Sequence, residues 1–475
     1  MAPSGSSGRG NAAPGSIEIC GVPLELSGES GSLTHRLMIL LRAGIRSGRL
    51  AAGTALPPSR SLAADLGCSR WVVTEAYGQL VAEGYLTARR GSATVVREIV
   101  PTSAAAASRG PRPEQRARYD LAPGVPDLAG FPRARWAESY RRAVQHRQTD
   151  RLTGSTMIGS LQARTTITDY LRRTRQVQED PTQLSLSTGA SAAAGWLARL
   201  LRALGHVRVA VEDPSWPGLR DAAGRAGLEL VPIPVDDDGL RVDLLDDHEV
   251  RAVITTPAHQ FPIGVPLSAE RRLALIDWAR RVDGLIIEDD YDAEFRYDRQ
   301  PVSSLQGMAP DRVALVGSTS KTLSVSVGLG WVILPQWLIM KILAEDLERN
   351  AGPPGFVVDA MGIMIDNGWY ERHLRAMRQS YRRKREAVLA AIAELLPGCV
   401  PSGMSAGLHL VLTLPVGVDV DHVVDRARSL DVGVVTMDRY RLQRSGEPQL
   451  VIGYGNLRSG REQEAISRLA AAVRS

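Results

Sequence analysis

The sequence predicts two domains of different fold class: a small helical domain that ends in a β-hairpin, then a large open α/β sheet. Through residues 33–81, apolar side chains recur at helical spacing, and two short strand-forming segments follow. From about residue 119 onward, short apolar strands alternate with helical stretches, which is typical of an open α/β sheet. With 475 residues, of which 44% are apolar, the chain is long enough to form a large core.

Composition narrows the class of protein further. Cys20, Cys68 and Cys399 lie far apart and match no zinc or redox spacing, which favours a reduced, cytoplasmic protein without a metal site. The most apolar long window, residues 323–340, contains polar residues, glycine and proline, so we expect no membrane span. Residues 1–30 begin with a Gly/Ser/Ala/Pro-rich run, and we expect them to form a disordered tail.

Helix signals and one basic turn define the small domain. Apolar Val73, Ala76, Tyr77 and Leu80 form one face of its last helix. In order, we expect a helix over 32–47 capped by Ser32, a short helix over about 59–66, a third helix capped by Ser69, and two strands around the basic turn 89–92. Three helices and a basic hairpin form a winged helix-turn-helix, whose recognition helix places its N-terminal residues on base edges.

Positive charge is concentrated in the same part of the chain. Residues 1–118 carry 14 arginines against 8 acidic residues, whereas the rest of the chain carries 43 basic against 44 acidic residues. An excess of basic residues in one region favours nucleic acid as its partner. Two alternatives are that the arginines serve only solubility and that the small domain only packs against another protein surface.

Several short motifs within residues 31–97 carry a family resemblance. They are Ser47-Gly48-Arg49-Leu50, Gly53-Thr54-Ala55-Leu56-Pro57, Ser59-Arg60-Ser61-Leu62-Ala63, Ser69-Arg70 and Ala82-Glu83-Gly84-Tyr85-Leu86. The segment resembles the GntR-type DNA-binding domain. The resemblance implies that double-stranded DNA is contacted by Arg60, Ser69, Arg70, Arg90 and Gly91. Val72 departs from the family pattern, which has a threonine that can bond a phosphate.

The large domain is expected over residues 119–475, after a basic Ala/Pro/Arg-rich linker at 98–118. Ligands in open α/β sheets bind at the carboxyl ends of the strands, and polar motifs follow several of the predicted strands. Ser187-Thr-Gly-Ala-Ser191 opens a helix, where free N–H groups suit an anion. Trp216 lies in a Pro-flanked loop and can stack on a ring; ordinary loop packing is the alternative.

An acidic segment follows another predicted strand. Asp289 and Tyr291 alternate along the chain and so face the same side, about 6.6 Å apart at 3.3 Å per residue. A carboxylate and a phenol at that separation can hold a pyridine nitrogen and the hydroxyl beside it on the ring. A Mg²⁺ site is the rival interpretation of these acidic residues. Asp236-Asp-Asp-Gly239 lacks the EF-hand pattern and is expected to be a turn.

Lysine is rare in this chain, because only three of its 57 basic residues are lysines. Lys341 and Lys384 lie in amphipathic or Arg-rich helical segments and are expected at the surface. Lys321 lies in a small polar loop after the apolar strand at 313–316. A primary amine can form a Schiff base, whereas a guanidinium cannot. Together with the anion-binding helix start, Trp216 and the Asp/Tyr pair, Lys321 indicates a pyridoxal phosphate site.

Motifs across the large domain carry a second resemblance. They are Pro123-Gly-Val-Pro-Asp127, Phe131-Pro132, Trp136, Thr256-Pro-Ala-His-Gln-Phe-Pro262, the EDDYDAEFRY run at 288–297, and Ser318-Thr-Ser-Lys-Thr-Leu323. The large domain resembles the type I pyridoxal phosphate-dependent aminotransferases. With its GntR-like head, the whole chain resembles the MocR family of transcriptional regulators. The resemblance assigns Lys321 to the Schiff base, Asp289 to the pyridine nitrogen, Tyr291 to the 3-oxygen, Trp216 to stacking, and Ala190, Ser191 and Ser318 to the phosphate.

Two arginines of the family pattern are missing. Gly328 stands where the family has an arginine that pairs with the cofactor phosphate, and Val451 stands where it has one that grips a substrate carboxylate. A charge-assisted contact contributes about 1.5–3 kcal/mol, so we expect weakened cofactor binding. We also expect that the protein is not an efficient aminotransferase.

The leading functional hypothesis is a DNA-binding transcriptional regulator whose large domain senses pyridoxal phosphate or its adduct with an amine. The family implies a head-to-tail homodimer that binds a double-stranded operator. One alternative is an active aminotransferase with a DNA-binding appendage. The other is a degenerate sensor of a different small molecule.

Overall fold

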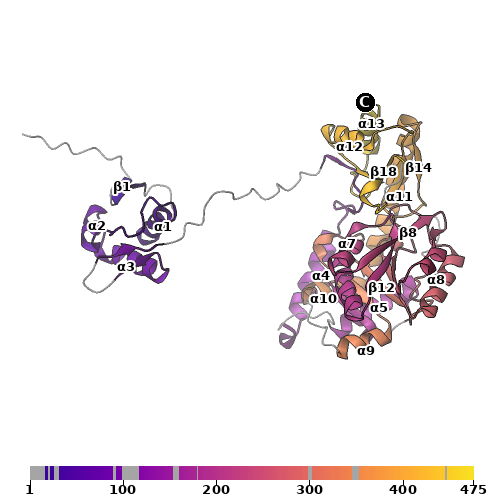
Figure 1. Ribbon diagram of the computed structural model, residues 1–475, viewed down its shortest axis with the longest axis horizontal. Helices are drawn as coiled ribbons and strands as arrows, with labels where there is room; N and C mark the ends of the chain where they lie inside the picture. Colours follow the sequence, from indigo (N-terminus) through magenta and orange to yellow (C-terminus); the bar gives the residue numbers. More distant parts are fainter. Residues whose placement is uncertain are drawn as a thin grey trace, which may run out of the picture. The chain divides into compact units, whose positions relative to one another are not determined.

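The computed structural model describes residues 16–19, 22–25, 31–88, 93–98, 117–152, 160–178, 180–297, 302–344, 352–443 and 447–474. The chain divides into two compact units, residues 1–114 and 115–475, each with its own hydrophobic core. Figure 1 shows the first unit around helices α1, α2 and α3, and the second around a large sheet with helices on both faces.

Three helices and a short hairpin form the first unit, as the sequence predicts. Ser32 caps the first helix, because its side chain accepts a hydrogen bond from the His35 N–H. Ser69 occupies the N-cap position of the third helix, although its side chain makes no capping bond. The elements are α1 (Leu33–Arg46), α2 (Ser59–Asp65), α3 (Arg70–Ala82), β3 (Leu86–Thr87) and β4 (Val95–Val96), and the two strands pair antiparallel.

Residues 16–25 differ from the disordered tail that composition predicts for 1–30. Strand β1 (Ser16–Ile19) pairs antiparallel with β2 (Val22–Glu25). Ile19 is completely buried in the core of the first unit, so burial of an apolar side chain opposes disorder in this segment. The prediction of a disordered tail is therefore wrong for these two strands. The linker residues 99–116 lie outside the described residues.

The second unit is built on a mixed sheet in the order β6-β13-β12-β11-β10-β7-β8-β9. Strands β12, β11, β10, β7 and β8 run parallel, whereas β13 is antiparallel to both β12 and β6, and β9 is antiparallel to β8. The strands are β6 (Leu184–Ser187), β7 (Arg208–Asp213), β8 (Glu229–Asp236), β9 (Gly239–Leu240), β10 (Ala252–Thr255), β11 (Leu285–Asp290), β12 (Val313–Ser318) and β13 (Gly330–Ile333).

Alternation along the strands sends successive side chains to opposite faces of this sheet. On β11, Leu285 and Ile287 pack with helices α6, α7 and α9, whereas Ile286 packs with α8. Figure 1 shows α7 and α8 on opposite sides of β8 and β12. These helices are α6 (Ala190–Ala203), α7 (Pro217–Arg225), α8 (Ala269–Arg281) and α9 (Gln336–Ala344). The parallel strands therefore end together at one edge, which is where polar side chains can meet.

A smaller antiparallel sheet, β14-β15-β18-β17, packs on helices α11 and α13. In addition, Tyr119 on β5 pairs with Val432 on β16, so the first strand of this unit lies beside a late segment of the chain. The remaining elements are α4 (Arg133–His146), α5 (Leu161–Arg175), α10 (Gly355–Asp366), α11 (Trp369–Leu395), α12 (Val420–Ser429), α13 (Glu462–Val473), β5 (Tyr119–Asp120), β14 (Val400–Ser402), β15 (His409–Thr413), β16 (Val432–Gly433), β17 (Val435–Thr436) and β18 (Gln449–Gly453).

Lys384 on α11 is buried, which contradicts the expected surface position. Its side chain is 2% exposed, and its Nζ lies 2.9 Å from both the Asp127 carboxylate and the Gly455 carbonyl oxygen. A buried ammonium needs such partners, because an unpaired charge in an apolar interior is strongly destabilising. The Arg-rich neighbours of Lys384 gave no sign of this long-range pairing.

No helix among the described residues is long and apolar enough to cross a membrane. The Asp236–Gly239 segment forms the tight turn between β8 and β9, as predicted. Its carboxylate at Asp236 pairs with the Arg271 guanidinium.

Candidate functional site

A cavity of about 400 Å³ lies where the large sheet's strands end. Every residue that the sequence assigned to cofactor binding lines it: Ala190, Ser191, Trp216, Asp289, Tyr291, Ser318 and Lys321. Parallel strands bring these positions together, because β11 ends at Asp290, β12 ends at Ser318, and α6 begins at Ala190. Further lining residues that sequence reasoning did not select include Gly124, Phe261, Asp292, Leu408, His409 and Tyr440.

Lys321 is anchored inside this cavity. Its Nζ donates a hydrogen bond to the Gly124 carbonyl oxygen and lies 6.0 Å from the centre of the Trp216 ring. Burial lowers the pKa of this amine, although Asp292 and Asp289 act in the opposite direction. A lowered pKa increases the fraction of neutral amine, which is the nucleophilic form.

Asp289 has an unsatisfied oxygen. Its Oδ1 is buried and accepts no hydrogen bond from the described residues. Burial, and then the neighbouring Asp290, raise the pKa of this carboxyl to about 8. A protonated pyridine nitrogen would supply both the missing donor and a positive charge. The site therefore fits the ring of pyridoxal phosphate.

Tyr291 belongs to a hydrogen-bonded group with His259 and Asp292. The Tyr291 hydroxyl lies 2.9 Å from His259 Nδ1, which is 3.0 Å from an Asp292 carboxylate oxygen. Burial and the Asp292 charge hold the pKa of Tyr291 well above its usual value, so the phenol keeps its proton. His259 was visible in the sequence only as part of the 256–262 motif.

The buried carboxylate of Glu212 holds the 256–262 segment in place. Glu212, at the end of β7, accepts hydrogen bonds from the Thr256 hydroxyl at 2.6 Å and from the Gln260 side-chain amide at 3.1 Å. These bonds fix the loop that presents Phe261 to the cavity. Burial raises the pKa of Glu212, against the opposing effect of its hydrogen bonds.

Hydroxyls and one helix start are available for a phosphate. Gly189 caps α6 with a φ of 140°, and Ser191, Ser318 and Ser320 line the cavity around it. Gly328 closes a short turn with a φ of 64° and does not line the cavity. Within the described lining, the one cationic side chain is Lys321.

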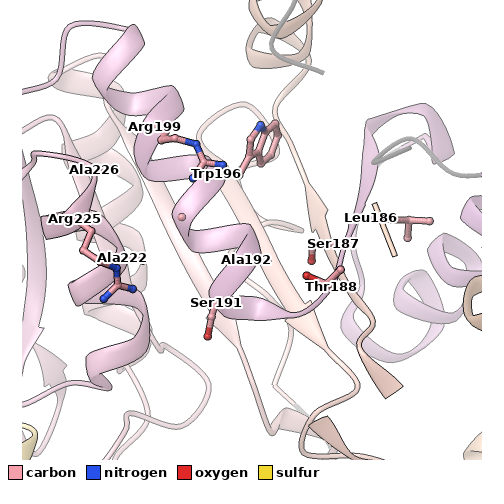
Figure 2. Close-up of a pocket in the computed structure, with 11 residues that line it drawn as sticks. Leu186, Ser187, Thr188, Ser191, Ala192, Trp196, Arg199, Ala222, Arg225 and Ala226 are labelled. Carbon is pink, nitrogen blue, oxygen red and sulfur yellow. The ribbon is translucent and has the colours of Figure 1, made fainter. Parts of the chain in front are cut away.

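A second cavity, of about 620 Å³, borders the first, because Thr188, Ser191 and Ala192 line both. Figure 2 shows it beside the first turn of α6, with Arg199 on α6 and Arg225 on α7. Neither arginine lines the cavity that holds Lys321. Among the described residues, no cluster of three or more His, Cys, Asp or Glu side chains is arranged to hold a metal ion.

The first unit presents a separate candidate surface for DNA. Arg60 on α2 and both Ser69 and Arg70 at the start of α3 are exposed. Arg70 Nε donates to the Ser59 hydroxyl at 3.2 Å, which holds its stem beside α2. Trp71, which sequence reasoning did not select, is 67% exposed beside them. Arg90 and Gly91, at the wing tip, lie outside the described residues.

Comparisons with known families match both units. Residues 33–96 match the model of bacterial regulatory proteins of the gntR family, and residues 119–415 match that of aminotransferase class I and II. Among solved structures, an archaeal alanine:glyoxylate aminotransferase is similar with a TM-score of 0.70 and 24% identity, covering 76% of this chain and 91% of its own. A kynurenine aminotransferase from Pyrococcus horikoshii has a TM-score of 0.68, 23% identity and the same coverage. These two likenesses show the fold.

Curated relatives match nearly the whole chain. The HTH-type pyridoxine biosynthesis transcriptional regulator PdxR of Corynebacterium glutamicum is 33% identical over 90% of this chain and 93% of its own. The probable rhizopine catabolism regulatory protein MocR of Rhizobium meliloti is 31% identical over 91% and 92%. The chain therefore belongs to the MocR-type transcriptional regulators, in which a gntR-family DNA-binding domain is joined to a domain of the class I and II aminotransferase family.

Proposed function

We propose that this regulator binds pyridoxal phosphate in the cavity around Lys321, and that the cofactor or its adduct with an amine alters DNA binding. The observation that carries this proposal is the unsatisfied, buried Oδ1 of Asp289 beside Lys321 and Tyr291. A buried acceptor without a donor is costly in an apolar interior. A ligand with a ring N–H satisfies it.

Each lining residue has a task suited to its chemistry. When bound, the cofactor supplies an aldehyde that forms a C=N bond with a primary amine. Lys321 provides such an amine, Asp289 accepts the ring N–H, and the Tyr291 hydroxyl donates to the ring oxygen. Trp216 covers one ring face, while the α6 start, Ser191 and Ser318 accommodate the phosphate.

The DNA half of the proposal assigns operator contacts to Arg60, Ser69, Arg70, Arg90 and Gly91. Their support is the gntR-family match together with the exposed side chains at the start of α3. We further propose a head-to-tail homodimer that reads paired half-sites. Relatives named for pyridoxine biosynthesis and for rhizopine catabolism support a regulator that answers to a small molecule.

The test combines a spectrum with a DNA-binding measurement. The full chain is used to select a duplex from a random library, and its affinity for that duplex is measured with and without pyridoxal phosphate. We expect a visible absorbance band and a change in affinity, both absent in Lys321→Ala. Lys321→Arg is the matched control, because it keeps the charge but cannot form the C=N bond. An equal absorbance band in Lys321→Ala contradicts the assignment of the Schiff base. DNA binding that depends neither on salt nor on sequence contradicts the regulator model.

A further inference from the structure

The residues lining the Lys321 cavity fall into two groups of different chemistry. One group, the helix end, comprises Gly189, Ala190, Ser191, Ser318 and Ser320, and it offers hydroxyls and a helix N-terminus. The other group, the aromatic end, comprises Phe261, Leu408, His409 and Tyr440. Phe261 packs against both His409 and Tyr440, with ring centres 4.8 and 5.1 Å apart.

The aromatic end packs against a buried apolar cluster. Phe261 and Tyr440 pack with Val411, Met437 and Val451, all of them buried. Val451 is completely buried and pairs across the sheet with Val411, so it exposes no surface to the cavity. No guanidinium lines this end among the described residues. A carboxylate placed here would lose its hydration without gaining a cation.

His409 adds an acceptor rather than a positive charge. Its Nε2 lies 3.1 Å from the Pro262 carbonyl oxygen, which can only accept, so Nε2 carries the hydrogen. In this tautomer Nδ1 is an acceptor. Burial and the neighbouring His259 hold the pKa of His409 well below its usual value, so the ring stays neutral. Asp292 is also an acceptor, and its carboxylate already contacts His259.

We infer that the effector entering the aromatic end is a primary amine that carries an apolar or aromatic group and no carboxylate. This inference rests on the proposed function, because the amine would exchange with Lys321. In that exchange a C=N bond to the effector nitrogen replaces the one to Lys321. Two hydrogens pass from the effector nitrogen to Lys321 Nζ, so the exchange needs no oxidant or reductant.

Matched ligand pairs test the inference on the unaltered protein. Phenethylamine is compared with L-phenylalanine, and 3-methylbutylamine with L-leucine, because each pair differs only in the carboxylate. The full chain is loaded with pyridoxal phosphate, freed of excess cofactor, and titrated while its visible band is followed. The same titrations of free pyridoxal phosphate give the intrinsic preference. Relative to that baseline, we expect the amines to half-saturate the protein at about ten- to a hundredfold lower concentration, as a missing charged partner predicts.

A variant then asks whether the missing guanidinium is the cause. Val451→Arg should reduce the amine preference by about tenfold or more, whereas Val451→Met, of similar length but uncharged, should preserve it. Thermal melts establish whether each variant folds, and the ligand pairs on the unaltered protein decide the inference if Val451→Arg does not. Equal or tighter binding of the amino acids overturns the inference while the proposed function stands. Absence of any visible band with pyridoxal phosphate overturns both.

Discussion

At the scale of single residues, the buried carboxyl of Asp289 is unfavourable for folding but suits a ligand that carries a hydrogen-bond donor. Its carboxyl is buried with Asp290 close by, and it has an oxygen that no described residue satisfies. Such a group destabilises the empty protein, because ionising it in an apolar interior is costly. A bound ring nitrogen would reverse that cost by offering a donor and a positive charge. This is the reason for which Asp289 carries the proposal of a bound cofactor.

Asp289→Asn should accordingly stabilise the cofactor-free protein. The folded carboxyl has a pKa of about 8, against an ordinary value of 3.8, so the folded state holds a proton that the unfolded state has released. Stability then falls as pH rises from about 4 to about 8 and levels off above that range. The variant lacks this titration, so its advantage should grow across the same window by about 1.4 kcal/mol per pH unit. Melting curves from pH 5 to 8 measure the difference in stability between the two proteins. A difference that does not vary with pH contradicts the assignment.

A second prediction concerns Gly328, which stands where the family pattern has an arginine that pairs with the cofactor phosphate. A Cβ at this position meets no atom within 4 Å, but the φ of 64° is left-handed and disfavours other residues. Gly328→Arg should tighten pyridoxal phosphate binding by about ten- to a hundredfold, and the gain is reduced by the free energy that the left-handed backbone costs an arginine. Gly328→Ala carries the same backbone cost without the charge and is the control. Fluorescence titration gives both dissociation constants, and equal values would mean that another group already neutralises the phosphate.

At the scale of elements, α3 presents its first turn to solvent and its apolar face to the core. Val73, Ala76 and Leu80 are buried, whereas Arg70 and Trp71 are exposed. This division follows from helical spacing, which leaves the N-terminal turn free to enter a major groove. Arg70 has the fork of donors that guanine accepts.

Arg70→Ala should therefore cost about 1–3 kcal/mol of discrimination between the selected duplex and a scrambled one. Arg428→Ala removes an exposed arginine from the other unit and controls for the change in net charge. Fluorescence anisotropy at fixed salt gives the six affinities that are needed, for the unaltered protein and both variants on each duplex. If both variants lose the same small amount on both duplexes, Arg70 contributes only general electrostatic attraction.

At the scale of the whole molecule, an aminotransferase fold is joined to a DNA-binding head, but its cavity lacks a described carboxylate clamp. Transamination requires the substrate to be held with its Cα–H bond aligned to the ring, and a bidentate arginine normally provides that orientation. Val451 is buried in an apolar cluster and cannot do so.

We therefore expect no sustained transamination of common α-amino acids. The amount of keto acid formed is compared with the amount of protein, with the kynurenine aminotransferase of the same fold as a positive control. Shifts of the visible band without repeated turnover fit a sensor. Repeated turnover of a simple α-amino acid would instead establish the protein as an enzyme with a DNA-binding appendage.

The sequence by itself determined that one group of polar residues would meet at the edge of the large sheet. Lys321, Asp289 and Ser191 all follow predicted strands, and parallel strands end at a common edge, so local pattern and strand direction suffice to bring them together. The first unit was predictable for the same reason. Its helix at Leu33–Arg46 and its cap Ser32 depend on spacing within a few residues.

Tertiary structure alone decided how those groups are paired and how deeply they are buried. Lys384 is buried because Asp127, far away in sequence, lies beside it, and Ile19 is buried because its strand reaches the core of the first unit. The unsatisfied oxygen of Asp289 and the closed apolar cluster around Val451 likewise depend on neighbours from distant segments. Burial and long-range pairing depend on which chain segments pack together, and periodicity along a single segment carries no record of that.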